Sequence, residues 1–147
     1  MPVTVRTCGA ARTVTGLSLL FETSRTKFLV DCGMFQGGRE APARNRAAFG
    51  RDLGRLDFVL LTHAHVDHCG LLPRFSAPGG PQVYCTKPTA DLVPVMLKDS
   101  AHVQAVGARS TPYRGRRSVT NAPLYSADDV DALALRLNGV PLSLIHI

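Results

Sequence analysis

The sequence predicts an α/β protein in which helices pack outside a sheet. Strand patterns come first in the chain, and later strand patterns alternate with helical ones, which is the order expected of a layered α/β architecture. A histidine-rich loop directly follows the apolar run Phe58-Val59-Leu60-Leu61, and α/β folds place their chemistry at such strand ends. A length of 147 residues suits one domain with a real core.

The first third of the chain predicts a small run of strands. Residues 3–7 alternate between apolar and polar side chains and are expected to form a strand. Residues 17–22 and 27–30 predict two more strands, joined by a hairpin at 23–26. A loop of small residues between Gly9 and Gly16 separates the first strand from this hairpin.

The middle of the chain predicts alternating helices and strands. Residues 39–49 favour a short, exposed, polar helix, with Pro42 confined to its early turns. Residues 56–61 predict a buried strand that leads into the histidine loop. A short helix broken by Pro73 follows, and residues 82–85 predict another strand.

Two further helices are expected. The longer one runs from Pro88 to about Val106, with a kink or an irregular turn at Pro94. We expect its apolar stripe to pack into the core: Leu92, Val95, Met96, Val103 and Val106. Ser126 can cap the last helix, which has acidic residues in its first turn and continues through Leu133, Leu135 and Leu137.

Composition points to a cytoplasmic protein with an anionic partner. No apolar run approaches the roughly 20 residues of a membrane helix, and no secretory signal is visible. The four cysteines show no CxxC pair and resemble buried thiols of a reducing compartment. The net charge of +6 favours nucleic acid as a partner, although many small proteins are basic without binding it. Homo-oligomerisation stays open.

One segment concentrates this positive charge. Residues 107–121 carry no acidic side chain and four arginines: Arg109, Arg114, Arg116 and Arg117. They form either an RNA-facing patch or part of an ordinary solvated loop, and both interpretations stay open.

The loop after the buried strand predicts a metal site. His63 and His65 alternate, so in an extended segment both side chains leave the same face. Asp67 and His68 are adjacent, so we expect them to diverge and to serve a second ion. Imidazole and carboxylate ligands suit zinc first, with manganese also feasible. Cys69 is a weaker candidate ligand beside them.

These residues resemble the metallo-β-lactamase superfamily, whose signature is HxHxDH. Residues 9–16, 31–37 and 61–73 are similar, more narrowly, to its β-CASP branch of nucleic-acid hydrolases. HxHxDH alone indicates only the superfamily. The run Asp-Cys-Gly-Met-Phe-Gln-Gly at 31–37, together with the glycine-bounded loop at 9–16, is what points to the RNA branch.

The resemblance implies roles for individual residues. His63 and His65 would hold one zinc ion, and Asp67 and His68 would hold another. Asp31 would orient a ligand histidine. Asp67 would position or deprotonate the water that attacks phosphorus, so it is the catalytic candidate.

The resemblance also implies an incomplete centre. Further ligands of the family come later than residue 147, so residues 1–141 would be the amino-terminal, truncated part of the αββα sandwich. His146 is a weak substitute because it lacks the family's Ala-Gly context. Residues 142–147 match the translation of a sequencing-library transposon end, and we interpret them as a non-native read-through tail. The alternative is a short apolar closing strand.

Three functions follow as hypotheses. The first is a zinc-dependent RNA phosphodiesterase, active as the full-length parent and inactive or nearly so as this chain. The second keeps the fold but acts on a thioester or lactam. The third is a non-catalytic module that binds zinc or RNA.

Overall fold

The fold is built on one mixed sheet. The computed structural model describes residues 2–48, 54–110 and 122–142. Within them lies a six-stranded sheet in the order β1-β2-β3-β4-β5-β6. Its strands are β1 (Thr4–Gly9), β2 (Ser18–Glu22), β3 (Lys27–Val30), β4 (Phe58–Leu60), β5 (Gln82–Thr86) and β6 (Leu137–Val140). The first three strands pair antiparallel, and β3 to β6 run parallel.

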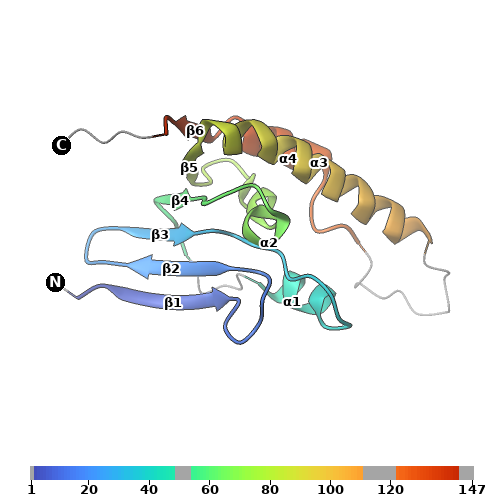
Figure 1. The fold of residues 1–147 in the computed structure, drawn as a ribbon, viewed down its shortest axis with the longest axis horizontal. Helices are drawn as coiled ribbons and strands as arrows, with labels where there is room; N and C mark the ends of the chain where they lie inside the picture. Colours follow the sequence, from blue (N-terminus) through green and yellow to red (C-terminus); the bar gives the residue numbers. More distant parts are fainter. Residues whose placement is uncertain (1, 49–53, 111–121, 143–147) are drawn as a thin grey trace.

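The helices connect the parallel strands, as parallel pairing requires. They are α1 (Ala41–Ala47), α2 (Val66–Cys69), the 3-10 helix η1 (Leu72–Phe75), α3 (Lys87–Ser110) and α4 (Ala127–Ala134). In Figure 1, α3 and α4 lie together beside β5 and β6, while α1 and α2 lie beyond the end at which β3 finishes. The expected α/β class is confirmed.

One face of the sheet forms the core. Leu20, Leu29 and Val59 are fully buried, and Val83 is nearly so. The same core cluster holds Val93, Leu97 and Leu133 from α3 and α4. Burial of each such side chain contributes about 1.5–3 kcal/mol. Helices α3 and α4 therefore pack on the face of the sheet that carries these strand side chains.

The opposite face carries a ladder of aromatic rings across four strands. Phe21 stacks on Phe28 with centroids 5.0 Å apart, and Phe28 stacks on Phe58 at 4.8 Å. Tyr84 meets Phe58 edge to face at 6.1 Å and is 40% exposed. These cross-strand pairs hold β2 to β5 in register.

The apolar stripe predicted for α3 is wrong. Its five side chains are 40–65% exposed, and the helix instead buries Val93, Leu97 and Ala101. Helical periodicity places apolar residues on two faces of α3, so periodicity alone does not choose between them. Packing against α4 and β6 buries the face of α3 that carries Val93, Leu97 and Ala101, which are spaced four residues apart. The helix runs without interruption through Pro94.

The end of the last helix is also corrected. Ser126 caps α4 through a full capping box with Asp129, as expected. The helix stops at Ala134, however, and Leu137 begins β6 instead of continuing it. Val83 donates its N–H to the carbonyl of Arg136 at 2.9 Å, so pairing with the edge of β5 replaces the next helical turn. Leu135 is left 88% exposed.

Other expectations need only small changes. The helix predicted over 39–49 is α1, and it buries Ala41 and Asn45 instead of being wholly exposed. Pro73 does not break a helix but lies in the first turn of η1. Among the described residues, no helix is long and apolar enough to cross a membrane. The tail at 143–147, including His146, lies outside the described residues.

Candidate metal centre

The histidine loop follows β4 and enters α2. The rings of His63 and His65 lie with centroids 4.6 Å apart, and that of His68 lies 4.0 Å from His63. The structure therefore gathers the three imidazoles at the end of the parallel strands, where the sequence predicted a site.

Two ring nitrogens converge in this group. His63 Nε2 lies 3.1 Å from His65 Nδ1. Such a pair is held together either by one shared N–H proton or by a cation that binds both nitrogens. Zn–N bonds of about 2.0–2.1 Å that meet at about 100° would span the same gap. The donor pair thus fits one zinc ion in spacing and in chemistry.

Asp67 and His68 do not diverge, contrary to our expectation. Asp67 Oδ2 lies 3.7 Å from His68 Nε2. Both residues belong to the short helix α2, whose turn brings the two side chains to the same side. They offer one carboxylate oxygen and one imidazole nitrogen as a second donor pair.

Asp31 stands directly behind His68. Its side chain is fully buried, and its Oδ2 lies 2.8 Å from His68 Nδ1. Its Oδ1 accepts the main-chain N–H of Thr62 at 2.8 Å. A carboxylate accepts, so His68 Nδ1 donates its N–H to Asp31, and in the neutral ring the lone pair lies on His68 Nε2.

Thr62 is a site residue that the sequence pattern did not reveal. Its hydroxyl lies 2.9 Å from Asp31 Oδ2 and 2.9 Å from His63 Nδ1. The carboxylate of Asp31 accepts the hydroxyl proton in a hydrogen bond, so the Thr62 oxygen accepts a hydrogen bond from the N–H of His63 Nδ1. In the neutral ring, His63 Nε2 then carries the lone pair that can bind a metal ion. A hydroxyl directly before the first histidine was the available signal.

Main-chain hydrogen bonds hold this loop against two others. Leu17 donates to the carbonyl of Asp67 at 2.9 Å, and Met34 donates to that of Val66 at 3.1 Å. A side chain at Gly33 would collide with the carbonyl of Asp67. Glycine at position 33 therefore permits the close approach of the segment after β3 to the ligand loop.

Cys69 is turned away from the donor atoms. It is fully buried in the core cluster, and its Sγ lies 3.4 Å from the carbonyl oxygen of Ala64. Burial, reinforced by the charges of Asp31 and Asp67, raises the pKa of Cys69 to about 12. A thiol in this state is a poor ligand.

The described residues offer two pairs of possible metal ligands, His63 with His65 and Asp67 with His68. No three His, Cys, Asp or Glu side chains converge as metal ligands within the described ranges. Catalytic zinc usually takes three protein ligands, so further donors are needed to close either site.

The basic segment is described only at its edges. Arg109 lies in the last turn of α3, while Arg114, Arg116 and Arg117 lie outside the described residues. The structure therefore leaves the RNA-facing patch a prediction.

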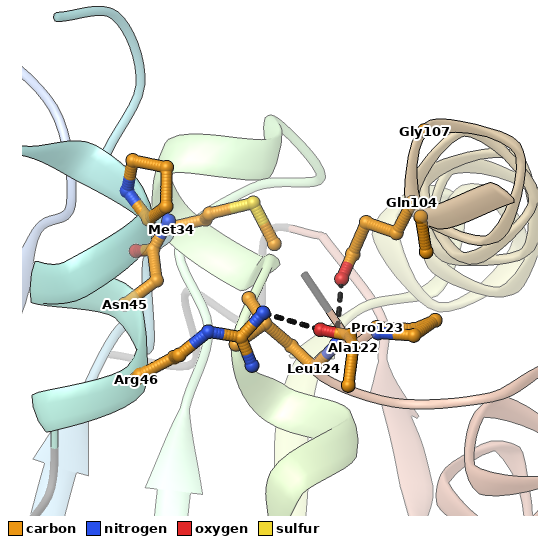
Figure 2. Close-up of a pocket in the computed structure, with 10 residues that line it drawn as sticks. Met34, Asn45, Arg46, Gln104, Gly107, Ala122, Pro123 and Leu124 are labelled. Carbon is orange, nitrogen blue, oxygen red and sulfur yellow. Dashed lines mark hydrogen bonds between the residues drawn. The ribbon is translucent and has the colours of Figure 1, made fainter. Parts of the chain in front are cut away.

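A cavity of about 240 Å³ lies between α1, α3 and the chain that leads into α4. Figure 2 shows Arg46 donating to the carbonyl of Ala122, and Gln104 accepting the N–H of Leu124, the latter at 2.8 Å. Its lining includes Met34 but none of the four expected ligands. The two hydrogen bonds attach the chain before α4 to α1 and α3.

Comparison with known proteins decides the family. The profile of the metallo-beta-lactamase superfamily matches residues 11–133. The chain belongs to this superfamily. The match includes Asp31, Thr62 and all four expected metal ligands.

Several curated relatives are similar to this member of the superfamily over most of its length. Ribonuclease TTHA0252 of Thermus thermophilus is 45% identical over 116 residues, which cover 78% of this chain and 25% of the relative. Transcription termination factor FttA of Methanocaldococcus jannaschii is 36% identical over 74% of this chain and 17% of its own. The chain thus spans a quarter or less of the length of these relatives.

Among solved structures, the metallo-beta-lactamase fold protein YhfI from Bacillus subtilis is similar at 19% identity and a TM-score of 0.45. That likeness covers 97% of this chain and 47% of the YhfI chain.

Proposed function

We propose that the chain is part of a zinc-dependent hydrolase of the β-CASP type that cleaves RNA phosphodiester bonds. The observation that carries the chemistry is the convergence of His63 Nε2 and His65 Nδ1 at 3.1 Å, with Asp67 and His68 beside them. Relatives named as a ribonuclease and a termination factor support RNA as the substrate, as does the net charge of +6.

Each residue has a defined task in this proposal. His63 and His65 hold one ion, and Asp67 and His68 hold the other. Asp31 keeps the His68 proton on Nδ1, which leaves Nε2 available as a ligand. When bound, zinc supplies Lewis-acid chemistry that stabilises negative charge on phosphoryl oxygens; manganese could replace it.

Asp67 is the proposed general base. Its carboxylate is 23% exposed and faces the same side as His68 Nε2, so a water can reach it. From there Asp67 can orient the attacking water and accept its proton, as a general base within hydrogen-bond reach does.

We further propose that residues 1–147 are inactive or nearly inactive alone, because each ion receives two donors from the described chain. Zinc content measured by mass spectrometry, with cleavage of labelled RNA in the presence and absence of chelator, tests both proposals. Robust chelator-sensitive cleavage by this chain alone would overturn the inactivity.

The substrate assignment needs its own comparison. The chain extended to the full length of its relatives should cleave RNA but neither a chromogenic lactam nor a glutathione thioester. Lactam or thioester hydrolysis without RNA cleavage would select the second hypothesis. RNA or zinc binding without turnover in the extended protein would select the non-catalytic module. A cytoplasmic location and homo-oligomerisation stay predictions.

A further inference from the structure

A second pocket lies next to the histidine loop and is not used by the proposed chemistry. It has a volume of about 630 Å³ and is lined by residues 13–15 of the β1–β2 loop and by residues 35–41 and 44. We call it the Phe35 pocket. Its lining includes Phe35, Gln36 and Gly37, the end of the run that distinguishes the RNA branch in the sequence.

The floor of the Phe35 pocket is rigid. Phe35 is 8% exposed, and a side chain at Gly16 would lie 2.6 Å from its ring. Asn45 is 5% exposed and clamps the main chain of Phe35 from both sides. Its Oδ1 accepts the Phe35 N–H at 2.7 Å, and its Nδ2 donates to the Phe35 carbonyl at 2.9 Å. A site held in this way loses little conformational entropy when a ligand binds.

Cationic groups stand over this floor. The Arg44 guanidinium lies 4.0 Å from the centroid of the Phe35 ring, which fixes its position by a cation–π contact. Arg39 is exposed at the rim. Across the described residues, neither arginine takes part in an ion pair. Glu40 is the acidic side chain of the lining, so positive charge prevails.

The rim also presents bare main chain. Gly37 and Gly38 have φ angles of +72° and +70°, and no atom lies within 4 Å of the position of a Cβ at either residue. A ligand can therefore approach their backbone closely. Val14 is 94% exposed on the opposite rim and offers an apolar surface.

The pocket is physically continuous with the metal loop. Met34, one residue before Phe35, donates its N–H to the carbonyl of Val66, and Leu17, the last residue of the β1–β2 loop, donates to that of Asp67. In Figure 1 the β1–β2 loop, α1 and α2 lie at the same end of the molecule. A single-stranded nucleic acid that lies in the pocket can thus extend toward Asp67.

We propose that the Phe35 pocket binds the phosphodiester backbone of single-stranded RNA next to the bond that is cleaved. Arg39 and Arg44 would contact phosphate oxygens, the Gly37–Gly38 main chain would allow close approach, and Val14 would contact a base. Arginine suits this task because its planar fork matches phosphate oxygens. The inference rests on the proposed RNA substrate, but it makes a claim about binding that does not depend on turnover.

Fluorescence anisotropy with a fluorescein-labelled 10-nucleotide single-stranded RNA tests it, in EDTA so that no cleavage occurs. For single strands, each phosphate that a cationic side chain neutralises adds about 0.7 to the magnitude of the slope of log K against log salt. The double variant R39A/R44A should therefore reduce that magnitude by about 1.4. R39A alone should reduce it by about 0.7 and cannot disturb the floor, because Arg39 is exposed.

The matched control is Arg25→Ala, which removes an exposed arginine from the β2–β3 hairpin. It should leave the slope unchanged. In amide NMR titrations with the same RNA, Gly37 and Gly38 should shift, while Gly79, which also has a positive φ and open surroundings, should not.

The outcomes separate this inference from the proposed function. Absence of RNA binding, or an equal effect of R25A and R39A, would overturn the pocket. If R39A/R44A binds RNA normally while the extended protein still cleaves RNA with zinc, RNA binding in the Phe35 pocket is refuted and the proposed nuclease function stands. Binding that depends on Arg39 and Arg44, without any cleavage by the extended protein, would keep the pocket and overturn the nuclease.

Discussion

Asp31 Oδ2 lies 2.8 Å from His68 Nδ1, although 37 residues separate the two in the chain. Asp31 directly follows β3 and has a φ of +60°, a left-handed conformation that is uncommon for a residue other than glycine. Its own N–H donates to the carbonyl of Leu60 at 2.9 Å. The backbone is therefore strained at Asp31, whose buried carboxylate is directed toward the histidine loop.

Replacement of Asp31 by asparagine should weaken metal binding. The Asn amide can present an N–H to His68 Nδ1, which would move the ring proton to Nε2 and remove the donor lone pair. We expect zinc affinity to fall by about 10–100-fold. Cobalt(II) titration followed by zinc competition measures it. Asp57→Asn, which changes an exposed carboxylate near Lys27, serves as the control and should bind normally.

Thr62→Val should change the protonation pattern of His63. The variant keeps the shape of the side chain but removes its hydrogen bonds to Asp31 and His63. We expect stability to fall by about 1–3 kcal/mol, since one partner is a buried carboxylate. Nitrogen-15 NMR of the imidazoles in the metal-free chain should show that the ring proton of His63 is no longer held mainly on Nδ1.

Thr7→Val is the matched control for this change, because Thr7 is exposed in β1. Its stability should stay within about 0.5 kcal/mol of the parent. An unchanged His63 tautomer in Thr62→Val would contradict the role assigned to the hydroxyl.

The capping box of α4 should make the free energy of unfolding depend on pH in the acidic range. Hydrogen bonds from the main chain and the hydroxyl of Ser126, and from Ser76, lower the pKa of Asp129. A lowered folded pKa means that the contribution is present above the ordinary Asp value of about 3.9 and is lost as the pH falls through the folded value. Asp129→Ala should cost about 1 kcal/mol at pH 7 and much less at pH 2.

Thermal unfolding at the two pH values measures this difference, with an expected shift of about 2–4 °C at pH 7. The neighbouring Asp128→Ala is the control, because Asp128 is exposed and lies outside the capping box. Equal shifts for the two variants would refute the capping role.

The buried thiols should resist alkylation. Burial raises the pKa of Cys32 and brings that of Cys69 to about 12, so little thiolate forms at pH 8. Cys8, which is half-buried, should react with iodoacetamide first. Mass spectrometry of the labelled native chain checks the order, and denaturant should expose all four thiols. Rapid native labelling of Cys69 would show that the ligand loop opens.

Local patterns sufficed for much of the fold. The strand segments at β2 and β3, the hairpin between them and the capping residue Ser126 are all short-range signals, and the structure confirms them. The same patterns failed for α3, where apolar side chains occur on two faces, and for Leu137, which the edge of β5 recruits into a strand. Both failures arise because a contact with a distant segment competes with a local preference.

The chemical identity of the candidate centre follows from the order of amino acids alone, because HxHxDH places imidazoles and a carboxylate in one short loop after a buried strand. How those groups meet depends on the folded chain. The turn of α2 brings Asp67 beside His68, and the end of β3 carries Asp31 beneath the loop, where Thr62 joins them. These distances depend on long-range backbone pairing between β3, β4 and the ligand loop, which residue spacing along the chain does not encode.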